Sequence, residues 1–187
     1  MAWGTEHRLK RSTPKAESGS TMFFALQVLT ITVVAVAMAL ALAHALELPG
    51  KLRLAKEQYF TIQPIYYPGF TFGGAAEPLG LLLSAILLFL TPPGTLAFWL
   101  IASAFIGLLA MQAIYWILTH PVNNFWLKDV ELRGVSAGFF SLAASRDPAR
   151  SGDPDWTNLR DQWEFSHVAR AVLGLISFIL LVMAVAL

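Results

Sequence analysis

The 187-residue chain has no cysteine and carries little charge. The absence of cysteine excludes disulfides, thiolate metal sites, a haem attached through a Cys-x-x-Cys-His motif and dithiol redox chemistry. Charged residues make up 13% of the chain, about half the share that is usual in soluble proteins, whereas hydrophobic residues make up 56%. A chain of this composition cannot form a water-soluble surface, so lipid must cover much of it.

An excess of charge of one sign is also missing. The formal net charge is +1, and the Lys and Arg residues are not clustered into a basic surface that could bind a phosphate backbone. Nucleic acid is therefore not expected as a partner. The chain has no glycine-rich phosphate loop, no Ser-His-Asp order and no His-Glu-x-x-His zinc motif. The expected partners are therefore the lipid bilayer and a small apolar substrate, and the sequence gives no indication of oligomeric state.

Long apolar runs are abundant. We expect a flexible basic tail at residues 1–20 and one membrane domain over residues 21–187. The run that begins near Met22 is too long for the core of a cleaved signal peptide, so it is expected to remain as the first helix. The apolar runs predict four membrane spans, at about residues 22–47, 78–91, 96–119 and 166–187.

Proline and glycine mark the expected ends of these spans. Pro78 suits the start of the second helix, with Glu77 at the positive end of the helix dipole. Residues 91–94 form a sharp break, the His120-Pro121 pair is expected to end the third span, and Asp153-Pro154 is expected to start the last helix. The predicted fold is all-α, an integral membrane up-down four-helix bundle. Its two long loops lie on one side because two crossings separate them.

Unusual polar residues gather at the loop-side ends of all four spans. Ionisable groups near membrane depth are costly unless they face the bundle interior, and by default they suggest function. Spacings of three and four also place Trp163, His167 and Arg170 on one face of the last helix. The residues of this layer are His44, Glu47, Glu77, His120, Asn123, Asn124, Trp163, Glu164, His167 and Arg170.

Two further interpretations of these residues remain open. Histidines near helix C-termini interact favourably with the dipole, and Arg170 could pair with Glu164 or reach the interface. Alternatively, the layer could hold a metal, because Glu164-x-x-His167 has the spacing of di-iron bundles, although His44-x-x-Glu47 has it reversed. The candidate ligands are His44, Glu47, Glu77, His120, Glu164 and His167; no cofactor is assigned.

The first long loop is rich in aromatic residues between Tyr59 and Phe72. This composition is typical of the aromatic belt at a membrane interface. It is also compatible with a lid over the mouth of the bundle, suited to a flat apolar substrate. In the second interpretation Tyr66 and Tyr67 are candidate substrate contacts.

Two stretches resemble a known family. The segment Pro121-Val-Asn123-Asn124-Phe-Trp-Leu127 resembles the proline-x-asparagine segment of the anthrone oxygenase-like membrane proteins, and Trp163-Glu-Phe-Ser-His167-Val-Ala-Arg170 is similar to that family's entry into its last helix. The resemblance covers about residues 22–187. It implies a site that uses Asn123, Trp163, His167 and Arg170, oxidation of an anthrone-like compound by molecular oxygen, and a multi-pass protein of a bacterial inner membrane.

Two functions of different classes follow. In the first, an oxygenase acts on an apolar aromatic substrate: His167 or His120 removes a proton, Arg170 and Asn123 stabilise the oxyanion, and Trp163 stacks on the ring. Asn124, Tyr66 and Tyr67 would be further substrate contacts. In the second, a non-catalytic membrane protein binds a lipid or a partner subunit, and the polar layer only joins the helix ends. A substrate-sized pocket open to lipid would favour the first; a closed, fully paired cluster would favour the second.

Overall fold

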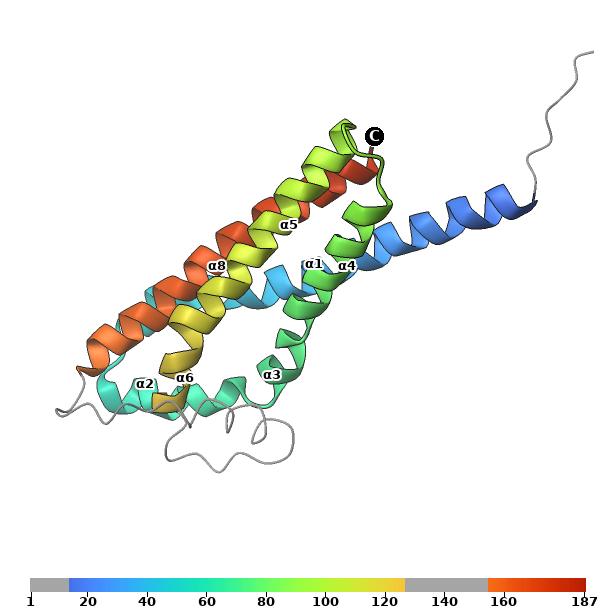
Figure 1. Ribbon diagram of the computed structural model, residues 1–187. Helices are drawn as coiled ribbons and strands as arrows, with labels where there is room; N and C mark the ends of the chain where they lie inside the picture. The colour runs from blue at the N-terminus through green and yellow to red at the C-terminus, as the bar shows by residue number, and fades with distance from the viewer. Residues whose placement is uncertain (1–13, 127–154) are drawn as a thin grey trace, which may run out of the picture.

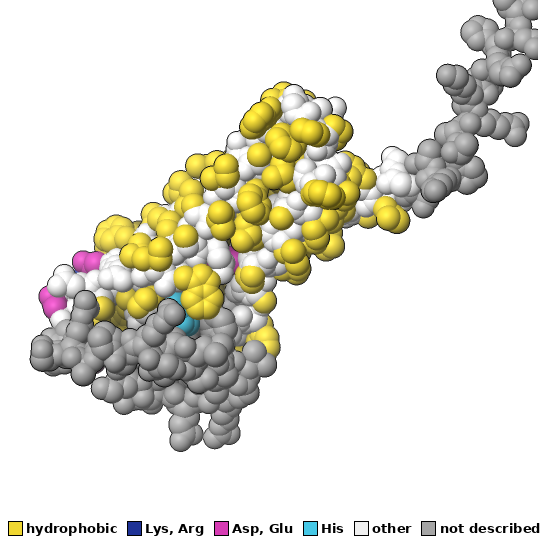
Figure 2. Space-filling model, in the orientation of Figure 1, with side chains coloured by type: hydrophobic (Ala, Val, Ile, Leu, Met, Phe, Trp, Pro, Cys, Tyr) yellow, Lys and Arg dark blue, Asp and Glu magenta, His cyan; other side chains and the backbone are white. Residues whose placement is uncertain are grey.

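The computed structural model describes residues 14–126 and 155–187, and within these ranges every regular element is a helix. Apolar side chains cover the outside of the bundle, with few charged groups among them (Figure 2). The all-α fold is confirmed, and its long apolar helices indicate a multi-pass integral membrane protein. Four helical segments are long and apolar enough to cross a membrane: Gly19–Lys51, Gly69–Leu90, Leu96–Asn123 and Trp156–Val185.

Four long helices form the bundle: α1 (Pro14–Lys51), α4 (Ala76–Leu90), α5 (Leu96–Ile114) and α8 (Trp156–Val185). Helix α8 packs against both α1 and α5, and α4 packs against α1 and α5 (Figure 1). Small residues let the helices approach closely, as is usual in membranes. At Gly174, for example, an added Cβ would lie 3.3 Å from the Cα of Met38, so α8 and α1 are in near-backbone contact there.

Helices α4 and α5 meet at one end of the bundle and separate toward the other (Figure 1). A tight turn joins them, in which Gly94 has a φ of 83° and the Thr95 side chain caps α5 by accepting from the Phe98 N–H at 3.1 Å. Glycine adopts this left-handed conformation without a steric penalty. From this turn the two helices diverge toward the loop end.

The second span and the loop before it are more helical than expected. The expected span over residues 78–91 is too short for about 30 Å of hydrocarbon. The structure adds α3 (Gly69–Gly74) ahead of α4, which gives a 22-residue segment. Pro78 is the third residue of α4 rather than the first, still within the turn whose N–H groups have no partner inside the helix. Before α3 lie α2 (Lys56–Ile62) and the 3₁₀ turn η1 (Gln63–Tyr66).

The third span does not end at the His120-Pro121 pair. A π-helical turn, η2 (Tyr115–Thr119), leads into α6 (His120–Trp126), and the His120 N–H bonds to the Tyr115 carbonyl. Proline has no N–H and its ring crowds the preceding turn, so a regular α-helix would be disrupted at Pro121. The wider π turn changes the register of the hydrogen bonds just before the proline. The helix therefore continues and carries Asn123 into the span.

Both ends of the described ranges differ from the expected boundaries. Helix α1 begins at Pro14, inside the stretch expected to be a tail, and residues 1–13 lie outside the described part. Helix α8 is capped by Asp155, whose carboxylate accepts from the Thr157 N–H at 3.0 Å and from its hydroxyl at 2.7 Å. These hydrogen bonds lower the pKa of Asp155. The predicted start at residues 153–154 lies outside the described residues.

Candidate functional site

A cavity of about 380 Å³ lies at the loop end of the bundle, in the space between α4 and α5. Its volume is within the range of small-molecule sites, about 300–1,000 Å³. Side chains of α1, α3 and α8 complete its walls, which are mostly apolar and aromatic. Tyr66 and Tyr67 line it from the first loop. Six residues of the predicted polar layer line it as well: His44, Glu77, Asn123, Trp163, His167 and Arg170.

Other predicted residues lie outside this lining. His120 is buried behind Tyr115, whose hydroxyl is 3.2 Å from His120 Nδ1, and its ring centre is 4.8 Å from that of Trp116. Glu47 and Glu164 belong to a neighbouring cluster described below. The side chain of Asn124 lies outside the described residues.

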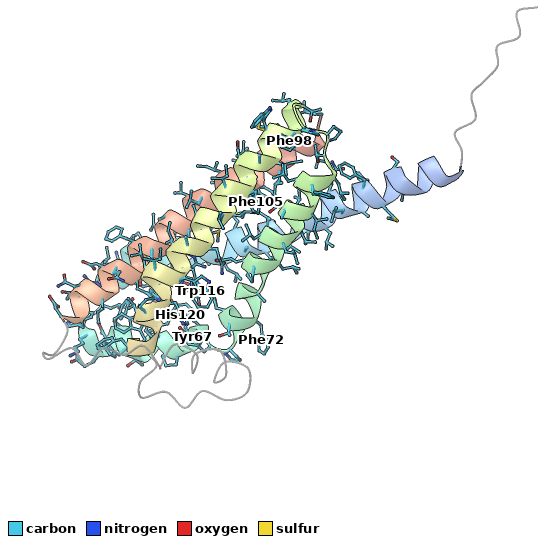
Figure 3. All side chains as sticks on the ribbon, viewed as in Figure 1. Tyr67, Phe72, Phe98, Phe105, Trp116 and His120 are labelled. Carbon is cyan, nitrogen blue, oxygen red and sulfur yellow. The ribbon has the colours of Figure 1, made fainter. Side chains whose placement is uncertain are left out.

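Two aromatic residues of the cavity lining are exposed on the outside of the bundle. Phe72 of α3 and Trp116 of η2 line the cavity, yet they are 59% and 48% exposed on the outside of the bundle. Figure 3 shows Trp116, His120 and Tyr67 close together at the η2–α6 end, with Phe72 apart from them on α3. One side of the cavity lining is thus formed by aromatic residues that are also exposed on the outer surface of the bundle.

Two histidines from different helices meet in the cavity wall. The ring centres of His44 and His167 are 4.2 Å apart, and the ring of Trp163 is 4.2 Å from His167 and 5.0 Å from His44. His167 Nδ1 is 2.8 Å from the Trp163 carbonyl oxygen. A carbonyl only accepts, so Nδ1 carries the hydrogen and Nε2 of the neutral ring is bare. His167 is thus arranged to accept a proton at Nε2.

A buried ion pair crosses the cavity from α8 to α4. Arg170 donates to Glu77 and not to Glu164, its other candidate partner, and Arg170 and Glu77 are 7% and 8% exposed. The Gln112 amide, with its nitrogen toward Glu77, donates to Glu77 Oε2 at 3.1 Å and accepts from Trp116 Nε1 at 2.8 Å. Arg170 Nε is buried and has no hydrogen-bond partner among the described residues. The protein therefore leaves part of this guanidinium unsatisfied.

Hydrogen bonds from η2 and α6 to α8 fix the aromatic wall. The Trp163 indole N–H donates to Asn123 Oδ1 at 2.6 Å, and the hydroxyls of Thr119 and Ser166 are 2.8 Å apart. The continuation of the third span through Pro121 places Asn123 at this height. The indole ring is consequently held in one orientation beside His167.

A second cluster, centred on Lys51, was missed by the sequence analysis. Lys51 is 3% exposed, and its Nζ lies 2.9 Å from Glu47 Oε2 and 3.5 Å from both oxygens of Glu164. The Tyr59 hydroxyl donates to Glu164 Oε1 at 2.8 Å, and the Tyr66 hydroxyl donates to Glu47 Oε2 at 2.7 Å. Burial and Glu164 raise the pKa of Tyr59; burial and the Glu47 hydrogen bond raise that of Tyr66. The clue in the sequence was the spacing of Lys51, four residues after Glu47 on the same helix.

The metal interpretation does not fit the donor geometry. Among the described residues, no three His, Asp or Glu side chains are grouped so that they could hold a metal ion. Two of the candidate carboxylates, Glu47 and Glu164, already pair with Lys51, and Glu77 pairs with Arg170. A metal would have to displace these cations, so no chemical step is assigned to one.

No protein-family model, curated protein or solved structure matches this chain. The function must therefore be argued from the cavity and its side chains.

Proposed function

We propose that this protein is a membrane oxidoreductase that oxidises a flat, apolar aromatic compound of the anthrone type with molecular oxygen. The observation that supports it is the cavity: its walls are aromatic, two of its aromatic residues are exposed on the outside of the bundle, and it is lined by an arginine and by a histidine with a bare Nε2. The resemblance of the Trp163–Arg170 segment to the anthrone oxygenase-like proteins points to the same chemistry.

His167 is the proton acceptor in this proposal. An anthrone has an acidic CH2 group opposite a ring carbonyl, and removal of one proton places negative charge on the carbonyl oxygen. His167 Nε2 takes the proton, and the Arg170 guanidinium, with Asn123, stabilises the oxyanion. Trp163 packs against the flat rings. His120, one layer behind Tyr115, supports that wall of the cavity.

The proposed reaction balances without a cofactor. The electron pair of the anion forms a C–O bond with O2, and the proton held by His167 returns to the resulting peroxide. Loss of the second hydrogen from the same carbon, with cleavage of the O–O bond, releases water and leaves a second carbonyl. The CH2 group loses four electrons and one O2 accepts them, so the compound and O2 yield a quinone and one water.

The test is oxygen uptake with 1,8-dihydroxyanthrone by the purified full-length protein in lipid nanodiscs, with empty nanodiscs measuring spontaneous oxidation. We expect quinone formation above this background, and a loss of roughly 100-fold or more in His167→Gln. Ser177→Ala, on α8 but away from the cavity, is the matched control and should retain the rate. Binding of the anthrone without oxygen uptake would instead support the non-catalytic function, and the absence of both would refute the proposal.

A further inference from the structure

The two cavity histidines are held with their hydrogens on opposite nitrogens. The ammonium of Lys51 has three protons and three nearby acceptors: Glu47 at 2.9 Å, Glu164 at 3.5 Å and His44 Nδ1 at 3.4 Å. An ammonium only donates, so His44 Nδ1 must accept and the neutral ring carries its hydrogen on Nε2. Glu47, at 3.8 Å from the same Nδ1, is too distant to hold a hydrogen there.

His167 has the reverse arrangement, because its Nδ1–H donates to the Trp163 carbonyl. In both rings Nδ1 is thus occupied by the protein, while Nε2 lies on the other side of the ring. Both rings line the cavity, and within the described part of the chain neither Nε2 has a hydrogen-bond partner. The cavity wall therefore offers one N–H donor and one bare nitrogen acceptor, on rings whose centres are 4.2 Å apart.

We propose that this pair of histidines selects an aromatic hydroxyl group, and that Lys51 is the positioning residue that sets the selection through His44. A hydroxyl both donates and accepts, so it satisfies His167 Nε2 and the His44 Nε2–H together. A carbonyl or an ether only accepts, and it leaves the His167 nitrogen without a partner. The inference rests on the proposed function in that the cavity is the substrate site, and it describes the complex before and after turnover: a hydroxyl bound at His167 Nε2 must leave this nitrogen before it takes the CH2 proton.

Lys51 also joins the ends of α1 and α8, so its replacement should destabilise the fold whether or not it orients His44. The role of Lys51 in orienting His44 therefore has to be measured on the histidine rings themselves. The ¹⁵N chemical shifts of the histidine rings in the full-length protein in nanodiscs distinguish a protonated from a bare nitrogen. We expect the hydrogen on Nε2 of His44 and on Nδ1 of His167. A hydrogen on His44 Nδ1 in the unmodified protein would overturn the proposal, and this measurement needs no variant.

The selection itself is tested with a matched pair of ligands, 2-hydroxyanthraquinone and 2-methoxyanthraquinone, at a pH where the hydroxyl is neutral. Quenching of tryptophan fluorescence reports binding. The hydroxyl compound should bind roughly tenfold or more tightly, because the methyl ether leaves a site nitrogen unpaired. Lys51→Met should move this ratio toward one, Lys51→Arg should retain it, and Arg53→Met, which removes an exposed cation two residues away, should leave it unchanged.

Equal binding of the two compounds by the unmodified protein would overturn the inference, whether or not the Lys51→Met protein folds. Failure of the proposed function is distinguishable, since both compounds are already quinones and need no turnover. A hydroxyl preference without anthrone-dependent oxygen uptake refutes the oxidation and retains the selection. Oxygen uptake without a hydroxyl preference refutes the selection and retains the oxidation.

Discussion

Two buried cations stabilise the loop end of this bundle, and the protein satisfies them differently. Lys51, at the end of α1, has an acceptor for each of its three protons, in Glu47, Glu164 and His44. Arg170, on α8, pairs with Glu77 and leaves its Nε without a partner among the described residues. Both cations are less than a tenth exposed.

The difference separates a cluster whose hydrogen bonds are complete from one that lines the cavity and, among the described residues, has a donor without a partner. A fully satisfied buried network favours a single arrangement of its elements, and the Lys51 cluster joins α1, α8 and, through its two tyrosines, the first loop. A buried donor without a partner costs free energy. Arg170 lines the cavity, but its unpaired Nε is itself buried, so this cost belongs to the packing around the Glu77 pair. We call the Lys51 group, with Glu47, Glu164, His44, Tyr59 and Tyr66, the closed cluster, and the Arg170–Glu77 pair with Gln112 the open cluster. The closed cluster holds the helix ends in place around the open cluster.

The largest expected effect comes from breaking the open cluster. Glu77→Leu leaves the Arg170 charge buried and unpaired, which should lower the free energy of unfolding by about 3–5 kcal/mol. The double variant E77L/R170L removes both charges and should recover most of that loss, because apolar replacement of a buried pair is often neutral. Equilibrium unfolding in mixed micelles measures both. The double variant should still fail to bind 2-hydroxyanthraquinone; if it binds as the unmodified protein does, the guanidinium is not part of the site.

A smaller loss is expected from the closed cluster. In Glu164→Leu, Lys51 keeps Glu47 at 2.9 Å, so no cation is left alone. The main loss is the acceptor of the Tyr59 hydroxyl, which is fully buried, at about 1–3 kcal/mol. Glu164→Gln, which keeps an acceptor, is the control and should lose less. If Glu164→Leu is as damaging as Glu77→Leu, the two clusters do not differ in the way that we describe.

The four helices and the polar layer were predictable because lipid imposes strict rules. Backbone groups in hydrocarbon must bond within the helix, so long apolar runs can be read as spans. For the same reason, His44, Glu77, Asn123, Trp163 and His167 stood out as polar groups at span ends. The structure brings all five to one cavity.

The partners of these residues were not predictable, because they depend on contacts between distant parts of the chain. Arg170 and Glu77 are separated by 93 positions, and only Glu164 lies near Arg170 in the sequence. Gln112 lies in an apolar run, and only the neighbouring helix shows what it binds. Lys51 lay beyond the predicted first span, which was expected to end near residue 47, one turn before the observed end of α1. The π turn before Pro121 likewise has no sequence pattern that we recognised.

Alkaline pH should weaken the closed cluster through its tyrosines. Burial and Glu164 raise the pKa of Tyr59 above its ordinary value of about 10, so the folded protein holds this proton more tightly than the unfolded chain does. The resulting stabilisation is complete below about pH 10 and is lost as the pH rises further, at about 1.4 kcal/mol per pH unit. Unfolding free energies measured above pH 10 should fall less steeply in Tyr59→Phe. An unchanged slope would show that Tyr59 ionises as freely in the folded state as in the unfolded chain.

The smallest effect should be that of Tyr66→Phe, which tests where the closed cluster meets water. The Tyr66 hydroxyl donates to Glu47, whose side chain is 43% exposed, so water can replace the lost hydrogen bond. We expect a loss of about 0.5–1 kcal/mol, against about 1.5–3 kcal/mol for Tyr59→Phe, whose acceptor Glu164 is fully buried and charged. The two variants remove the same atom from the two carboxylates of one lysine, so unfolding in mixed micelles compares them directly. Equal losses of unfolding free energy in the two variants would mean that Glu47 is as inaccessible to water as Glu164. The Lys51 cluster would then have no contact with the aqueous side.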